Sequence, residues 1–207
     1  MIKLIKPLFS FLVIFCINTI NSQNQFRINY DIGNFDIPGG ITEASSGNYV
    51  FAGFNSSALS FHSNVVELDV AWNVVWANKY ESGFAFNISD IKTLSSSNYI
   101  VAGTDNSDAI LMNLDVSGNL NWGKSYSFLN ATGSYCNRVK ATSDGGYVAA
   151  GAVTGFDSDG SGPQPKRDSS NIFIFKTNSI GTLLWKKVLY VNIDDDHSVN
   201  DVAEVVD

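Results

Sequence analysis

The sequence predicts an all-β fold built from repeated units, and three observations support this prediction. The 207 residues are 44% apolar and 13% aromatic, with 17 glycines, a composition that favours short strands joined by turns. A tyrosine-led apolar segment recurs three times at nearly constant spacing. Each copy is followed by a second shared block that ends in a tryptophan. Repetition over this period indicates one supersecondary unit per repeat.

The first shared segment is a tyrosine that opens an apolar run ending in Ala-Gly. It occurs at residues 49–53, 99–103 and 147–151. The second shared block ends in Trp76, Trp122 and Trp185. The tyrosine-led run is apolar at every position, which is typical of a strand covered on both faces.

Each unit reads as four strands. In the second unit we predict strands at 88–94, 99–103, 109–114 and 120–126, with turn residues between them. Residues 115–119 and 177–181 predict hairpin turns in which glycine supplies a positive φ. The first unit has Trp72 where this glycine would stand, so a different turn is expected there.

Four short strands per unit predict a β-propeller-like array of four-stranded antiparallel blades, incomplete in this chain, with a β-solenoid as the alternative. Residues 25–31 match the last strand of a unit, as expected if an N-terminal strand completes the final blade of a ring. The predicted blades are 39–80, 87–126 and 135–190, with the start of a fourth at 199–207, all within a domain at 23–207. An open array of this kind is expected to self-associate through its end blades.

The first 22 residues resemble an export signal. Lys3 and Lys6 precede an apolar stretch at 8–17 that is too short to span a bilayer, and we predict cleavage after Ser22. An uncleaved anchor and a lipoprotein attached at Cys16 are the alternatives. Cleavage would leave Cys136 as the single cysteine, which we interpret as a small core residue rather than a nucleophile. The expected location is secreted, extracellular or cell-surface, without a membrane span after cleavage.

The third unit carries a specific repeat signature, Asp144-Gly145-Gly146-Tyr147 with Ala150-Gly151, then 173–176, then Gly181 four residues before Trp185. This pattern resembles the repeats of large secreted proteins of Bacteroidetes-type bacteria, over residues 39–207. The resemblance implies a propeller-like fold and a C-terminal type IX secretion sorting domain, with this chain as an N-terminal fragment. The family is mostly uncharacterised, so the resemblance implies no reaction.

Charge and loop composition limit the partners. The formal net charge is −7 without a Lys/Arg run, which excludes nucleic acid as an expected partner. Residues 156–162 alternate carboxylates before a glycine, so Asp157, Asp159 and Asp168 are candidate Ca²⁺ ligands, the alternative being a solvated surface loop. Residues 194–197 are interpreted as a charged turn. The sequence offers no catalytic residue set and no motif for an organic cofactor.

Two function classes follow. The first is a non-catalytic module that binds a glycan or protein through the loops at one end of the array. The second is part of an extracellular hydrolase or lyase with a propeller active site, which would need convergent titratable groups in a pocket. The sequence favours the binding or adhesion module.

Overall fold

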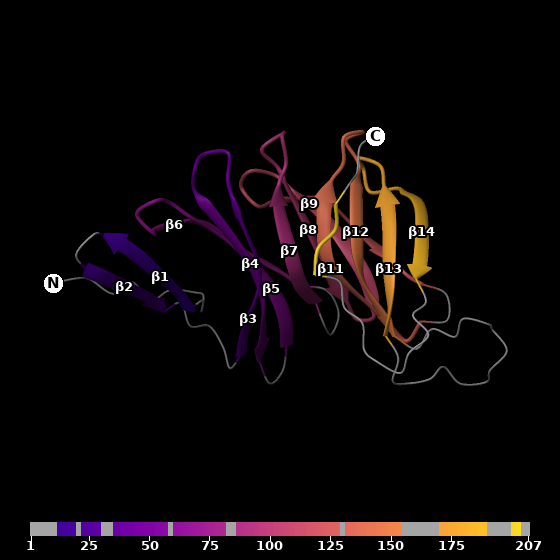
Figure 1. The fold of residues 1–207 in the computed structure, drawn as a ribbon, viewed down its shortest axis with the longest axis horizontal. Helices are drawn as coiled ribbons and strands as arrows, with labels where there is room; N and C mark the ends of the chain where they lie inside the picture. The colour runs from indigo at the N-terminus through magenta and orange to yellow at the C-terminus, as the bar shows by residue number, and fades with distance from the viewer. Residues whose placement is uncertain are drawn as a thin grey trace.

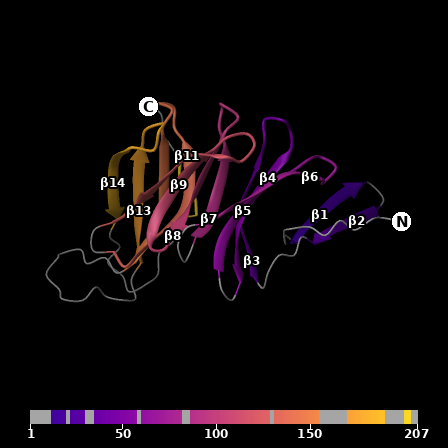
Figure 2. The same ribbon diagram turned by 180° about the vertical axis from the view of Figure 1, so that it is seen from behind.

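The structure of the chain is a computed structural model that describes residues 12–19, 22–29, 35–57, 60–81, 86–128, 131–154, 170–189 and 200–203. All fourteen elements in these ranges are β-strands. Twelve of them form three four-stranded antiparallel sheets that stand side by side in chain order (Figures 1 and 2). The predicted all-β, propeller-like array is thereby confirmed, and the three blades form an open array rather than a closed barrel.

Within each sheet the strands follow one another in sequence order, as in a meander. The first sheet contains β3 (Phe35–Glu43), β4 (Tyr49–Ser57), β5 (Ser60–Leu68) and β6 (Val74–Tyr80). The second contains β7 (Phe86–Thr93), β8 (Tyr99–Asp105), β9 (Asp108–Leu114) and β10 (Leu120–Tyr126). The third contains β11 (Gly133–Ala141), β12 (Tyr147–Thr154), β13 (Ser170–Thr177) and β14 (Leu183–Leu189).

The apolar second strand of each unit is explained by the two cores that separate the sheets. Tyr99 and Val101 of β8 face the first sheet and pack with Val50, Ala52 and Val65. The alternate residues, Ile100 and Ala102, face the third sheet and pack with buried residues of β11, β12 and β13. Because successive side chains of a strand point to opposite faces, a strand between two sheets must be apolar at every position.

A bulge in the first strand of each sheet explains why the repeated motif ends in glycine. Ser89 is the extra residue of β7, because Ile88 pairs with Gly103 and Asp90 with Ala102. A Cβ on Gly103 would lie 2.0 Å from the carbonyl oxygen of Asn87, and one on Gly151 would lie 1.9 Å from that of Tyr135. The bulged backbone therefore passes so close to the second strand that only glycine fits there.

The turn between the third and fourth strands has the same hydrogen bonds in all three sheets. In the second sheet Gly118 N donates to Asp115 O and Asp115 N to Asn119 O. The first sheet repeats these bonds with Trp72 N donating to Asp69 O, and Trp72 has a φ of 66°. The expectation of a different turn in the first unit is wrong, since tryptophan adopts the left-handed conformation that glycine adopts in the other sheets.

Aspartates in the turns that follow the first and third strands make the stability of the protein depend on acid pH. Hydrogen bonds from Asn73 and Asn119 lower the pKa of Asp69 and Asp115, and bonds from Lys176 and Thr142 do so for Asp144. A pKa that is lower in the folded state contributes stability above the unfolded value, near 4, which is lost as the pH falls toward the folded value. We expect the urea midpoint to be level above about pH 5 and to fall below about pH 4.

The third sheet supplies the matched control for this pH dependence. Asn178 stands at the position of Asp115, and its Oδ1 accepts the backbone N–H groups of Ile180 and Thr182 at 3.2 and 2.8 Å. Asp69→Asn and Asp115→Asn should therefore fold and show a shallower loss of the urea midpoint below pH 4. An unchanged acid slope in the double variant would contradict the assignment.

Both ends of the chain carry segments outside the three sheets. β2 (Ser22–Asn29), which includes most of the predicted closing strand, pairs antiparallel with β1 (Leu12–Thr19) in a two-stranded sheet. At the other end, Asn200 accepts a hydrogen bond from Arg138 at 2.7 Å, and Val202 packs on Val148 and Ala150 of the third sheet. No helix long and apolar enough to cross a membrane occurs among the described residues.

Candidate functional site

The antiparallel meander gives the array two chemically different ends. The turns that follow the first and third strands of each sheet lie at one end, which we call the turn end. The connections between the second and third strands lie at the other, which we call the loop end. The turn-end turns repeat the same backbone hydrogen bonds six times. The loop-end connections span 58–59, 106–107 and 155–169, so the first two are equally short and the third is longer.

The described part of the loop end presents an exposed aromatic ring among small polar residues. Tyr135, near the start of β11, is 48% exposed. Ser107 O of the β8–β9 hairpin accepts the backbone N–H of Ser134 at 2.8 Å, which holds the second and third sheets together at this point. We define the loop-end patch as Asn106, Ser107, Thr132, Tyr135 and Thr154.

The β11 and β12 strands position this patch by a short backbone connection. Thr132 N donates to Thr154 O at 2.9 Å, and the two hydroxyl groups lie 3.4 Å apart. Asn106 has a φ of 55°, the conformation that a two-residue hairpin requires and that asparagine tolerates. The polar groups of the patch are therefore carried on ordered backbone.

Two buried oxygens close to the patch have unused hydrogen-bonding capacity. Ser134 Oγ and Asp105 Oδ1 make no hydrogen bond to any described residue. Buried polar atoms are normally satisfied, and an unsatisfied one calls for a water, ion or further chain segment. Residues 129–130, which precede Ala131, and residues 155–169, which follow Thr154, lie outside the described residues.

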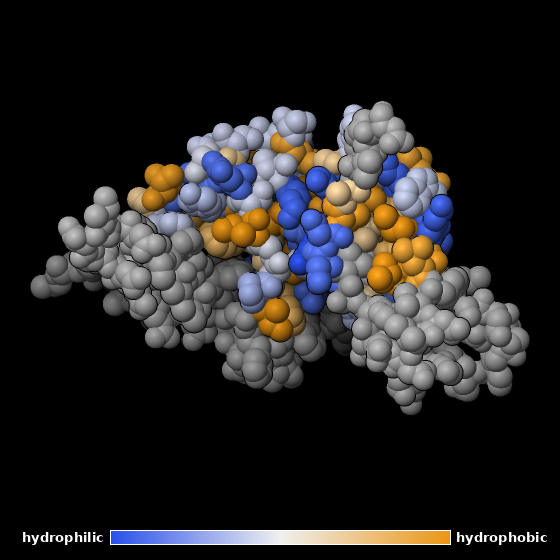
Figure 3. Space-filling view, in the orientation of Figure 1, coloured by the Kyte–Doolittle hydropathy of each residue, from blue (hydrophilic) through white to orange (hydrophobic). Residues whose placement is uncertain are grey.

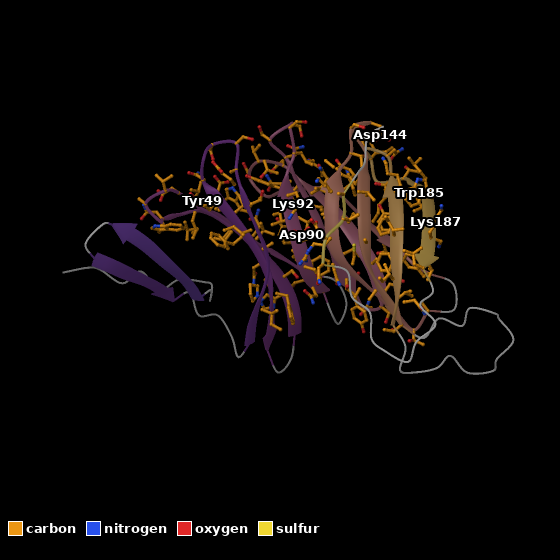
Figure 4. All side chains as sticks on the ribbon, in the orientation of Figure 1. Tyr49, Asp90, Lys92, Asp144, Trp185 and Lys187 are labelled. Carbon is orange, nitrogen blue, oxygen red and sulfur yellow. The ribbon has the colours of Figure 1, made fainter. Side chains whose placement is uncertain are left out.

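On the inner edge of the array, buried charged groups connect the sheets. β3, β7 and β11 lie side by side there, and hydrophilic residues gather over β7 in the middle of this face (Figure 3). Asp90 accepts from Ile91 N at 3.0 Å and from Lys92 Nζ at 2.6 Å through Oδ1, and from Val139 N at 3.1 Å through Oδ2. Figure 4 places Asp90 and Lys92 on β7 at this edge. Both oxygens of this carboxylate serve structural bonds.

A second set of buried polar residues occupies one position of the third strand in every sheet: Glu67, Asn113 and Lys176. Glu67 accepts from Asn48 and from the indole of Trp76, both at 2.6 Å. Burial, and then the charge of Glu67, raise the pKa of Tyr99 to about 12. Lys176 is buried and pairs with the exposed Asp144 at 2.8 Å. These groups are neutralised or hydrogen-bonded inside the sheets.

Cys136 is fully buried and free, as the interpretation of a small core residue requires. Burial, followed by the nearby charge of Asp90, strongly raises the pKa of its thiol. A buried thiol with a raised pKa is a poor nucleophile. Cys136 therefore belongs to the core between the second and third sheets.

The residues predicted as Ca²⁺ ligands, Asp157, Asp159 and Asp168, lie outside the described residues, as do residues 194–197. Within the described ranges, no three His, Cys, Asp or Glu side chains come together as a group that could hold a metal ion. The sequence reasoning missed the buried Asp90, Glu67 and Lys176. For Glu67 and Lys176 the available signal was one polar residue at the same position of an otherwise apolar strand.

Comparison with known proteins finds similar folds among solved structures. No family model matches the chain, and no curated protein matches it significantly. A solved structure of a Bacteroides caccae protein of unknown function is 13% identical, with a TM-score of 0.32, over 80% of this chain and 72% of that one. The cobalt-substituted apocarotenoid oxygenase of Synechocystis is 15% identical, with a TM-score of 0.48, over 80% of this chain and 42% of that one. The class established by the structure is an all-β, propeller-like repeat protein.

Proposed function

We propose that this protein is a secreted or cell-surface propeller-like module that binds a glycan or protein ligand through its loop end. The observation that carries the proposal is the contrast between the two ends of the array. The turns of the turn end repeat the same backbone hydrogen bonds in every sheet, whereas the loop end has two-residue connections in the first and second sheets and a connection at 155–169 in the third. Variable connections on a rigid repeated scaffold are where binding residues concentrate.

The composition of the loop-end patch favours a glycan as the ligand. Tyr135 offers an exposed ring, and Asn106, Ser107 and Thr132 are exposed polar residues of the same patch. A tyrosine side chain combines an apolar ring with a polar hydroxyl. A sugar also has an apolar ring face and polar hydroxyl groups, so the two can pack together and hydrogen-bond. The export-like N-terminal segment supports an extracellular setting, where such polymers are abundant.

Part of an extracellular hydrolase or lyase is the second candidate. It is supported by the acidic residues of the segment 155–169, which follows Thr154 of the patch in the sequence. This candidate predicts product release from a bound polymer, which binding alone does not produce.

The test is binding of the purified chain to a panel of immobilised glycans and to intact bacterial surfaces, with Tyr135→Ala as the variant. Loss of the ring should weaken binding by about tenfold, corresponding to 1.4 kcal/mol. A second variant replaces residues 155–169 by Asn-Gly, since Thr154 and Ser170 are paired and a two-residue turn can join them. It should weaken binding at least as much.

Ile180→Ala is the matched control, because Ile180 is 61% exposed in a turn at the opposite end. It should leave binding unchanged. Equal effects of the Tyr135 and Ile180 variants, or no binding to any surface of the panel, would overturn the proposal. Release of new reducing ends from a bound glycan would favour the hydrolase or lyase instead.

A further inference from the structure

The contact between neighbouring sheets is built from the same types of residue in both places where it occurs. The ring of Trp76 lies on Gly118 of the next sheet, where a Cβ would come within 2.5 Å of it. The same ring packs against Tyr99 with a centroid distance of 6.1 Å. Tyr80, four residues after Trp76, donates its hydroxyl to Gly118 O. We call this arrangement the Trp–Gly–Tyr contact.

The second and third sheets repeat this contact with different residues. The ring of Trp122 lies within 2.7 Å of the Cβ position of Gly181 and 5.9 Å from the ring of Tyr147. The hydroxyl of Tyr126 donates to Gly181 O at 2.7 Å. The contact is therefore directional. One sheet supplies the tryptophan and the hydroxyl-donating tyrosine, and the sheet that follows supplies the glycine and the tyrosine ring that packs on the tryptophan.

The third sheet carries the tryptophan of a further contact. Trp185 stands at the position of Trp76 and Trp122 and is 43% exposed, on an outer strand that also exposes Leu184 and Leu189. Figure 4 places Tyr49 on the first sheet of the row and Trp185 on the outer strand of the last sheet. On the inner strands of the same sheet, Asn200 and Val202 already lie against Arg138 of β11 and Val148 of β12, at the positions that Ser89 and Ile91 hold in β7.

The first sheet cannot receive a tryptophan from a preceding sheet in this way, because its own Trp72 occupies the position. Tyr49 stands at the position of Tyr99 and Tyr147, and Trp72 stands at the position of Gly118 and Gly181. The two rings stack at 5.5 Å with an interplanar angle of 8°. Trp72 thus covers, from within the same sheet, the tyrosine that a preceding tryptophan covers in the other sheets.

From this asymmetry we propose that the Trp185 face of the third sheet docks a further blade of the same repeat type. That blade completes its sheet on residues 200–203 and carries glycine in its last turn and tyrosine at the start of its second strand. The first sheet of a second copy of this chain does not fit, because Trp72 occupies the glycine position. On the first sheet, Trp72 therefore occupies the place that the tryptophan of a preceding blade takes in the other sheets.

The test extends the chain by the blade that the proposal describes. Asp201 and Val202 correspond to Asp90 and Ile91, and in both pairs the carboxylate accepts the next backbone N–H. A copy of residues 97–126 joined directly after Asp207 therefore continues the repeat in register. We expect this extended chain to have a higher urea midpoint than the chain without the addition.

Two variants of the extended chain separate docking from mere lengthening. Gly118→Trp in the added copy alone imitates Trp72 of the first sheet, and Trp185→Ala removes the docking ring. Either change should abolish the gain in urea midpoint. A gain that survives both changes, or the absence of any gain in the extended chain, would overturn the proposal.

The chain without an addition gives an independent test. Trp122→Ala removes a ring that is docked on the next sheet and should lower the urea midpoint clearly. Trp185→Ala removes the undocked equivalent and should leave the midpoint almost unchanged. Equal losses from the two variants would show that Trp185 is already docked elsewhere and would contradict the proposal.

Discussion

Replacing Gly151 by alanine should destabilise the protein by about 3 kcal/mol or more, or prevent folding. The added Cβ would lie 1.9 Å from Tyr135 O and 2.9 Å from the Cα of Cys136. Both are backbone atoms next to the bulge of β11 between Cys136 and Arg138, so no side-chain rotation can relieve the clash. Relief of the clash requires the first two strands to separate, which would break their hydrogen-bonded ladder. Urea unfolding followed by circular dichroism measures the loss.

Gly123→Ala is the control for this prediction. Gly123 is exposed in the outer strand β10, and an added Cβ would meet side-chain atoms at 3.6 Å or beyond. Its free energy of unfolding should change by less than about 0.5 kcal/mol. If the two alanine variants were equally stable, the close approach of the bulged strand would not be the reason for the repeated Ala-Gly.

Replacing Asp90 by alanine should cost about 3 kcal/mol of folding free energy. Its buried carboxylate is the acceptor for Val139 N on the neighbouring sheet and for Ile91 N on its own strand. The change leaves both N–H groups without this acceptor and removes a bond between two blades. Asp90→Asn keeps one acceptor oxygen and should lose less. Urea unfolding measures both variants.

Lys92→Met removes the ion pair of Asp90 and leaves its hydrogen bonds to backbone N–H groups, so it distinguishes their contributions to stability. The Lys92 side chain is 44% exposed, and an ion pair open to solvent on one side contributes about 1 kcal/mol or less. We therefore expect a small loss from this variant. A loss as large as that of Asp90→Ala would mean that the charge pair, and not the inter-sheet hydrogen bond, carries the stability.

Among the described residues, the polar groups that hold the sheets together are buried, and most of those in the loop-end patch are exposed. Asp90, Glu67 and Lys176 are buried and bonded within or between sheets. The loop-end patch keeps exposed polar groups and a ring on a fixed backbone. This division is what a scaffold with a binding end requires, and it directs mutagenesis to Tyr135 rather than to the buried acids.

The strands could be predicted because the same pattern of apolar and turn residues occurs in three aligned copies of the repeat. The range 120–126 was predicted as a strand and is β10, and the apolar run at 99–103 is most of β8. The turn at Trp72 was not predicted, because a tryptophan with positive φ opposes its local preference. Only the stack on Tyr49 explains why this residue occupies a glycine position.

By itself, the sequence determined the all-β class, the four-stranded unit and the period, since these follow from local patterns of apolar residues and turns. It also marked the tryptophans, but not what they contact. Tertiary structure alone decided that Gly118 and Gly181 seat the ring of the preceding sheet and that Trp72 closes the first sheet. It alone placed Asp90 against Val139 N. These facts depend on residues far apart in the chain, and their partners are fixed only when whole sheets pack together.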